Sequence, residues 1–338
     1  MRQSQKVKAK VKKKKEGEVE CEEKKEGEGE GEGEGEEKKE EVFKITNATL
    51  DSSSFRAALL ACAVTGSVIV EINISMCQVT PAQIMDLTKA LEVLGPKCRS
   101  LKLNHLHNIQ NTEDYHDCIT KLISIMGLQY LSLQGNGFDD NFVSNTIGPA
   151  LKTNYTLKSL NLSDNGITDK GANTLFHALR HRTNLTHISL RSNSLTGSFL
   201  SDTLAKLVTG RMEVTADDEA YIKGISKEFG NKNKTIKDLN KKRKGAGQQE
   251  YMEIPEQASL MKTAKDSSSV LMNKSIAVVD ISLTKMIDSN EIQKAIDETK
   301  ETNVEGQDEN ENKTTIVAKM SHINETISTE SACFSWIQ

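Results

Sequence analysis

The chain has 338 residues, and 44 basic against 48 acidic side chains give it a net charge of −4. Only 36% of its residues are hydrophobic and 4% are aromatic, too few for one core along the whole length, so we expect a folded region flanked by disordered segments. The sequence has no run of about 20 apolar residues, which argues against a membrane-spanning helix. Its Lys-rich start has no apolar core of the kind that secretory signals carry. We therefore expect a cytoplasmic protein.

Residues 1–42 form two blocks of opposite charge. Residues 1–15 contain eight basic side chains and no acidic one, whereas residues 16–41 contain fourteen glutamates and four lysines, a balance of −10. Like charges repel one another, and the alternating Glu-Gly run from Gly27 to Gly35 has no apolar side chain that could pack. We predict that this segment is disordered.

The cysteines indicate neither a zinc ribbon nor a redox dithiol, because no two of the six form a C-x-x-C pair. In a reducing compartment they should be free thiols. Four of them lie in apolar runs, and we interpret these as small core residues: Cys62, Cys77, Cys98 and Cys118.

Residues 43–212 contain a repeated pattern, Leu-x-x-Leu-x-Leu-x-x-Asn, which is typical of leucine-rich repeats. Five copies follow one another in steps of 28 to 30 residues, and they begin at Ile69, Cys98, Leu128, Leu157 and Leu185. The first two have Cys77 and Leu106 at the asparagine position. In this pattern the Leu-x-Leu alternation is a short parallel strand with its leucines in the core. The repeats predict an α/β solenoid, with a parallel sheet on the concave face and helices on the convex face.

The second half of each repeat carries apolar residues at helical spacing. Thr80-Pro81, Asp139-Asp140 and Thr168-Asp169 have the residue types that begin helices. Ahead of the first strand, residues 52–64 predict an amphipathic helix that caps the end of the core. The length of the repeats and the run from Asn161 to Ala172 resemble the ribonuclease-inhibitor-like class of leucine-rich repeat proteins. This resemblance covers about 145 residues.

The asparagine at the end of each full repeat is predicted to be structural, because its amide can satisfy backbone groups in the turn. This predicts a ladder of Asn136, Asn165 and Asn193. The residues between and beside the core leucines should form the concave surface, the usual binding face of a solenoid. They include one tyrosine and one arginine, types that are enriched at binding hot spots. The candidate surface residues are Lys102, Asn104, Tyr130, Ser132, Gln134, Ser159, Asn161, Ser163, His187, Ser189 and Arg191, with Asn73 and Ser75 on the first strand.

The repeat register is lost after residue 212. Residues 213–270 read as a charged insertion, with a helix from Asp217 to about Leu239 and then a linker. The spacing of Val278, Ile281, Leu283 and Met286 then predicts a sixth, degenerate repeat within 271–300, before a mostly disordered tail over 301–338. This interrupted layout resembles the leucine-rich repeat-containing protein 71 family. That resemblance implies a protein associated with ciliary axonemes.

No catalytic motif is present: the sequence has no nucleophile elbow, P-loop, H-E-x-x-H or dinucleotide fingerprint. His177 and His181 are spaced i,i+4, but no carboxylate or cysteine completes a metal site at a fixed offset. We therefore predict no enzymatic activity, no cofactor and no metal. The basic blocks at Lys12–Lys15 and 241–244 are interpreted as solvated charge, with nuclear import or contact with an acidic polymer such as a tubulin tail as alternatives.

The sequence leaves three functions open. The first is a scaffold that binds another protein, without specific nucleic acid, membrane or small-molecule substrates. The resemblance to the leucine-rich repeat-containing protein 71 family implies an axonemal or microtubule protein as its partner. The second is a regulator of a small GTPase, because Ran GTPase-activating proteins also contain such repeats. The third is a ubiquitin-ligase substrate adaptor, which needs a helical module that this chain has little room for.

Overall fold

A computed structural model gives the structure of the chain. It describes residues 18–23, 40–47, 55, 57, 59, 68–110, 112–179, 185–199, 203, 216–254, 278–281 and 315–317. Among these residues, no helix is long and apolar enough to cross a membrane.

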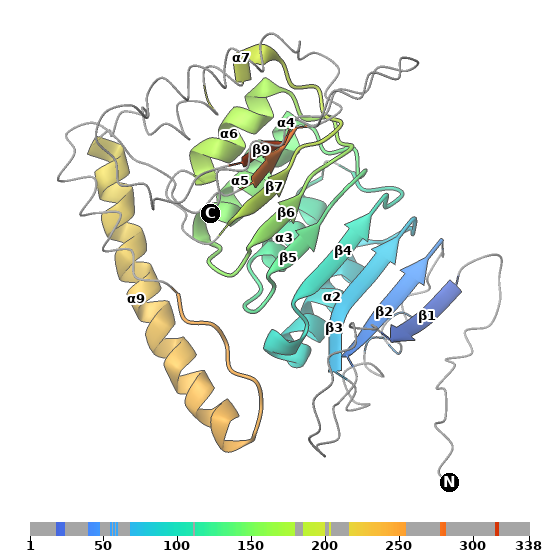
Figure 1. Cartoon of the computed structure of the whole chain (residues 1–338), viewed down its shortest axis with the longest axis vertical. Coiled ribbons are helices and arrows are strands. Elements are labelled where there is room, and N and C mark those ends of the chain that lie inside the picture. Colours follow the sequence, from blue (N-terminus) through green and yellow to red (C-terminus); the bar gives the residue numbers. More distant parts are fainter. Residues whose placement is uncertain are drawn as a thin grey trace.

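One sheet organises the described residues, and its strands lie side by side in chain order (Figure 1). They are β1 (Glu18–Glu23), β2 (Glu40–Thr46), β3 (Val68–Ser75), β4 (Ser100–Asn104), β5 (Tyr130–Ser132), β6 (Ser159–Asn161), β7 (His187–Ser189), β8 (Val278–Asp280) and β9 (Thr315–Val317). Strands β2 to β9 pair in parallel, whereas β1 is antiparallel to β2. The fold is therefore α/β, and β3 to β7 coincide with the five strands that the repeats predict.

Helical segments join the strands and lie behind the sheet in Figure 1, so that one face of the sheet is covered and the other is open. They are α2 (Pro81–Leu94), η1 (Gly95–Lys97), α3 (Glu113–Ile123), α4 (Asp140–Phe142), η2 (Val143–Ile147), α5 (Gly148–Thr153), α6 (Asp169–Leu179) and α7 (Gly197–Phe199). The first has a capping box, because the Thr80 backbone N–H donates to Gln83 Oε1 at 2.8 Å and the Gln83 N–H donates back to Thr80 Oγ1. Asp139 caps α4 with a single bond, because its side chain accepts from the Phe142 N–H at 2.8 Å.

The core lies between the sheet and these helices. Leucines that alternate along the strands, such as Leu131, Leu160 and Leu162, are buried in it. Phe138 and Phe142 stack at 4.1 Å between their ring centroids and add a large apolar contact. At the first end of the core, Phe55 and Leu59 are helical and buried. The other residues of the predicted capping helix lie outside the described part of the chain.

A left-handed residue follows each of the strands β2 to β7 and turns the chain toward the helical layer. Six equivalent residues have φ between 51° and 68°: Asn47, Met76, His105, Gly135, Asp164 and Ser192. The backbone N–H of each of the first three donates to a carbonyl of the next strand turn, at 2.7 to 3.0 Å. Because Asn47 shares this geometry and β2 buries Phe43 and Ile45, β2 is one more strand of the repeat type, which the repeat pattern did not reveal.

Strands β1 and β2 correct the prediction of disorder within residues 1–42, and β9 is a short strand within the tail that we predicted to be mostly disordered. Strand β1 lies within residues 1–42. This segment forms a strand because Val19 and Cys21 alternate with glutamates and because its backbone pairs with the edge of β2. Strand β2 begins at Glu40, inside the same segment. Strand β9 lies within residues 301–338 and pairs with β8. The other residues of both tails lie outside the described ranges.

The returning strand β8 lies beside β7, with Val279 opposite Ile188. Val279 and Ile281 therefore take the two buried strand positions that the sequence assigned to Ile281 and Leu283, a slip of two residues. Side chains alternate with a period of two, so a slip of two leaves the same set on the core side and the hydrophobic pattern alone cannot detect it. The predicted helix after β8 lies outside the described residues.

The charged insertion contains α9 (Ala216–Gly245), which includes the predicted helix and continues six residues beyond it. Figure 1 shows it beside the repeats rather than in the helical layer. Phe229 and Ile236 form a small second core with Tyr155, which lies in the segment between α5 and β6. The chain then turns back along α9 as an extended strap, residues 246–254, whose Ile254 completes this core.

Candidate binding surface

The open face of the sheet carries the side chains that alternate with the core leucines. All eleven predicted surface residues are on it or at its edge, and ten are partly or fully exposed. Ser163 is the exception, because it is buried. The face is thus polar at its surface and apolar directly beneath.

A groove of about 720 Å³ runs over β3 to β6 on this face. Seven predicted residues line it: Lys102, Asn104, Tyr130, Ser132, Gln134, Ser159 and Asn161. The other four, Ser163, His187, Ser189 and Arg191, do not line it and belong to the β6–β7 side of the sheet. Sequence reasoning missed Glu71, Arg99 and Ser100, which also line the groove. The alternation could have revealed Glu71, because it lies two residues before Asn73 on the same face of β3.

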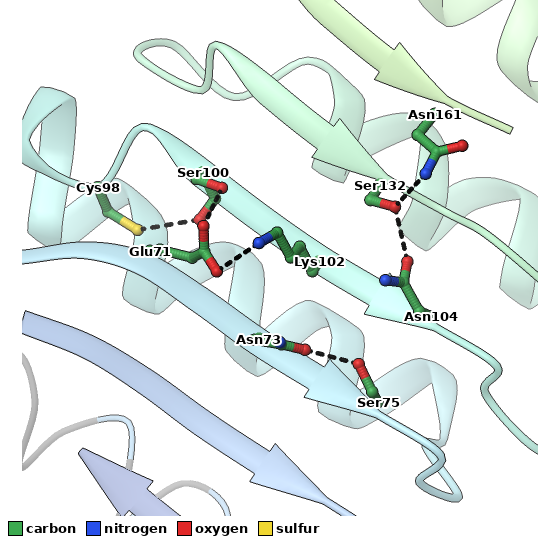
Figure 2. A network of polar contacts seen from close by, with 9 residues as sticks. All are labelled: Glu71, Asn73, Ser75, Cys98, Ser100, Lys102, Asn104, Ser132 and Asn161. Carbon is green, nitrogen blue, oxygen red and sulfur yellow. Dashed lines mark hydrogen bonds and ion pairs between the residues drawn. The ribbon is translucent and has the colours of Figure 1, made fainter. Parts of the chain in front are cut away.

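A charged network marks one end of the groove (Figure 2). Lys102 Nζ lies 2.8 Å from Glu71 Oε1, and Ser100 Oγ donates to Glu71 Oε2 at 2.9 Å. The Glu71 side chain is only 13% exposed, whereas that of Lys102 is 42% exposed. The carboxylate is therefore held by two donors from the neighbouring strand, and the ammonium group remains partly available to a partner.

Beyond this network, hydrogen bonds link polar side chains from one strand to the next. We call this series the polar chain, and it consists of Asn104, Ser132, Asn161, Ser163, Ser189 and Asp280. Ser132 Oγ donates to Asn104 Oδ1 at 2.7 Å and accepts from Asn161 Nδ2 at 3.1 Å (Figure 2). Ser163 Oγ contacts Asn161 Oδ1 at 2.5 Å and Ser189 Oγ at 2.8 Å. Ser189 Oγ donates to Asp280 Oδ2 at 3.3 Å. These bonds orient the side chains of β4 to β8 before any ligand is present.

Tyr130 is the large side chain that projects from this surface, with 48% exposure. In the sheet register it lies between Ser100 and Ser159, two small residues that leave its ring open on both sides. Tyrosine combines a broad apolar ring with a hydroxyl group, and such side chains contribute strongly when an interface covers them. The arrangement therefore suits a contact with another macromolecule better than chemistry on a small molecule.

The three asparagines of the predicted ladder all bond to backbone groups in the turns. Asn165 Oδ1 accepts from the N–H groups of Asn136 and Phe138, each at 3.0 Å, and its Nδ2 donates to Leu162 O at 2.9 Å. Asn136 accepts from the Leu106 N–H at 2.9 Å, and Asn193 accepts from the Ile167 N–H at 3.1 Å. Their amides thus satisfy buried backbone of adjacent repeats and are not directed at a ligand.

Three cysteines of the described residues, Cys77, Cys98 and Cys118, are buried and form no disulfide. Burial raises the pKa of the Cys118 thiol to about 11, so that this thiol stays protonated and unreactive at neutral pH. In the described part of the chain, no group of three or more His, Cys, Asp or Glu side chains gathers as a metal site. Of the histidine pair considered above, His181 lies outside the described residues.

Comparison with known proteins agrees with the repeat pattern. The family described as Leucine Rich repeat matches residues 153–176, which include β6 and most of α6. Comparison with curated proteins gave no match. The solved structure of leiomodin-1 actin-binding site 2 is similar, with 21% identity and a TM-score of 0.32 over 47% of this chain and 95% of that chain. The family match supports a leucine-rich repeat protein, a type that binds other proteins.

Proposed function

We propose that this chain is a non-catalytic scaffold, a leucine-rich repeat solenoid that binds another protein through the open, concave face of its sheet. The observation that carries the proposal is the groove over β3 to β6, in which a half-exposed tyrosine stands among polar side chains that are already bonded to one another. A surface oriented in advance loses little side-chain entropy on binding. Tyr130 is then the anchor, and Lys102 and Gln134 are the polar rim around it.

The experiment places a photo-crosslinking amino acid at position 130 of the full chain, expressed in cells. The matched control carries the same amino acid at Val93, which is 68% exposed on α2 in the layer behind the sheet. We expect a protein to be captured from position 130 and not from position 93. The captured protein, purified, should bind the unmodified chain at least about tenfold more tightly than a Tyr130→Ala variant, because anchor residues contribute about 2 kcal/mol or more. Equal capture at both positions, or equal affinity for both chains, would refute the groove as the binding surface.

We further propose the ciliary axoneme as the place where this scaffold acts. The support is the layout of the chain, in which a repeat array is interrupted by a charged insertion and then resumes. The tagged full chain should remain along the axoneme of a ciliated cell after detergent extraction. A signal that is soluble in the cytoplasm or nucleus would reject the axonemal location, and it would leave the groove experiment unaffected.

A further inference from the structure

Helix α9 carries a row of lysines on its outer side, which we name the basic stripe: Lys227, Lys234, Lys237, Lys241 and Lys244. At about 100° per residue these positions fall within a sector of about 100° of the helix circumference. All five are exposed. Asp238 is the acidic residue on the same side, while Glu228 is engaged with Lys232 at 2.7 Å. The stripe is therefore a strongly positive surface on a helix that the repeats do not require.

The orientation of this stripe is set by the opposite side of α9. Phe229 and Ile236 are buried there, and Lys232 lies 5.5 Å above the ring of Tyr155. Two asparagines then clamp the strap. Asn233 exchanges hydrogen bonds of 2.7 and 2.8 Å with the backbone of Ile254, and Asn240 exchanges bonds of 2.7 and 2.8 Å with that of Tyr251.

The two asparagines and their two strap partners are spaced by nearly the same distance. Seven helical residues from Asn233 to Asn240 rise about 10.5 Å, and three extended residues from Tyr251 to Ile254 span about 10 Å. The helix therefore cannot rotate about its axis without breaking these bonds, and the stripe is held facing solvent.

The cations of the stripe are largely unneutralised within the described residues. Lys237 Nζ lies 3.5 Å from Glu253 Oε2, and the other four stripe lysines form no ion pair there. The nearby arginine is differently placed. Arg243 Nε donates to Gln249 O at 2.7 Å, and its guanidinium lies 5.0 Å above the Tyr251 ring. The cations offered to a ligand are thus the lysines of the stripe, with Asp238 as an acidic neighbour.

We propose that the basic stripe is a second interaction surface, which binds an extended acidic segment of a partner protein. The stripe is about 26 Å long, and an extended peptide of about eight residues covers that length. Lysine is a flexible point charge that accepts carboxylates in many arrangements. Nucleic acid fits less well, because the stripe presents no aromatic side chain for base stacking and its arginine neighbour is already engaged. The basic stripe is separate from the groove, so an experiment can refute one of the two proposed binding surfaces without refuting the other.

The test measures the binding of a fluorescein-labelled peptide of about eight glutamates to the full chain by anisotropy, at low and at physiological salt. The stripe variant is Lys234→Gln with Lys241→Gln and Lys244→Gln. The control variant makes the same charge change at Lys89, Lys121 and Lys170, which are exposed on α2, α3 and α6. We expect the stripe variant to weaken binding by about tenfold and the control by no more than about twofold, with affinity falling as salt rises.

Three outcomes would overturn the proposal. If changing Lys12–Lys15 to glutamine abolishes binding while the stripe variant does not, the N-terminal lysines are the binding site. If an oligothymidylate of equal charge binds the stripe more tightly than the peptide, the ligand is a nucleic acid. If the peptide binds only after the glutamates of 26–37 are changed to glutamine, the stripe serves this chain's own acidic block.

Discussion

The repeats and the insertion are held together in different ways. In the repeats, each strand has a neighbour of the same kind on both sides, and the same leucine and asparagine contacts recur from β5 to β7. Helix α9 has one small apolar contact and two asparagine clamps, each of which occurs once. Loss of a contact in the repeats should therefore spread through the array, whereas loss of a contact of α9 should stay local.

The largest expected effect comes from truncating a core leucine. Leu160→Ala removes a side chain that is 1% exposed and should lower the free energy of unfolding by about 2–5 kcal/mol. Ile236→Ala makes a similar deletion at a fully buried site on α9 and should remove amide protection from α9 alone. Denaturant unfolding combined with hydrogen exchange separates the two. Loss of protection in β6 with Ile236→Ala would show that the regions are one cooperative unit.

A smaller global effect is expected from the asparagine ladder. Asn165→Ala leaves the N–H groups of Asn136 and Phe138 without their acceptor and should cost about 1–3 kcal/mol. Asn141→Ala, on the exposed side of α4, is the control and should change the free energy by less than about 0.5 kcal/mol. Denaturant midpoints compare the two variants. Equal midpoints would mean that water replaces the amide without cost.

Alkaline pH should act on α9 through Tyr155. Burial, with a smaller contribution from Tyr251, raises the pKa of the Tyr155 phenol to about 12 from its usual 10. A raised pKa means that the folded contact favours the neutral phenol, so this stability is complete below pH 10 and is lost as pH rises toward 12. Hydrogen exchange of α9 in that range should show the loss, and Tyr155→Phe should abolish this dependence. The same alkaline loss in the phenylalanine variant would assign it to another group.

The smallest expected effect is a gain. Met76 occupies one of the left-handed turn positions with φ of 55° and is 52% exposed, whereas Asn47 and Asp164 occupy equivalent positions. Asparagine tolerates this conformation better than methionine, so Met76→Asn should stabilise the repeats by up to about 1 kcal/mol. Met76→Leu keeps the strain and should not. A calorimetric melting temperature that rises equally in both variants would contradict this account.

Much of the fold could be predicted because the same short sequence pattern recurs in each repeat and predicts the same strand and turn each time. The strands at Leu131, Leu160 and Ile188 follow from a period of about 29 residues, and the asparagines mark their turns. Most of the groove followed as well, since alternation along the strands selects its face. The sequence did not predict strands β1, β2 and β9, whose segments lack the Leu-x-x-Leu-x-Leu-x-x-Asn pattern. Strand β2 lacks the full repeat pattern. Strand β1 alternates apolar residues with glutamates, and β9 has only three residues, so neither carries the pattern.

The sequence by itself determined the repeat period, the core leucines and the polar face. The period is given by one pattern that recurs in steps of 28 to 30 residues, and the two faces by the alternation of side chains along each short strand. Only the tertiary structure decided that Glu71 pairs with Lys102, that Val279 lies opposite Ile188, and that α9 is clamped by Asn233 and Asn240. The first contact depends on the side-chain rotamers of Glu71 and Lys102, and the second joins residues on either side of the insertion. The asparagine contacts form only when the strap folds back onto α9. None of these conditions follows from the local spacing of residue types.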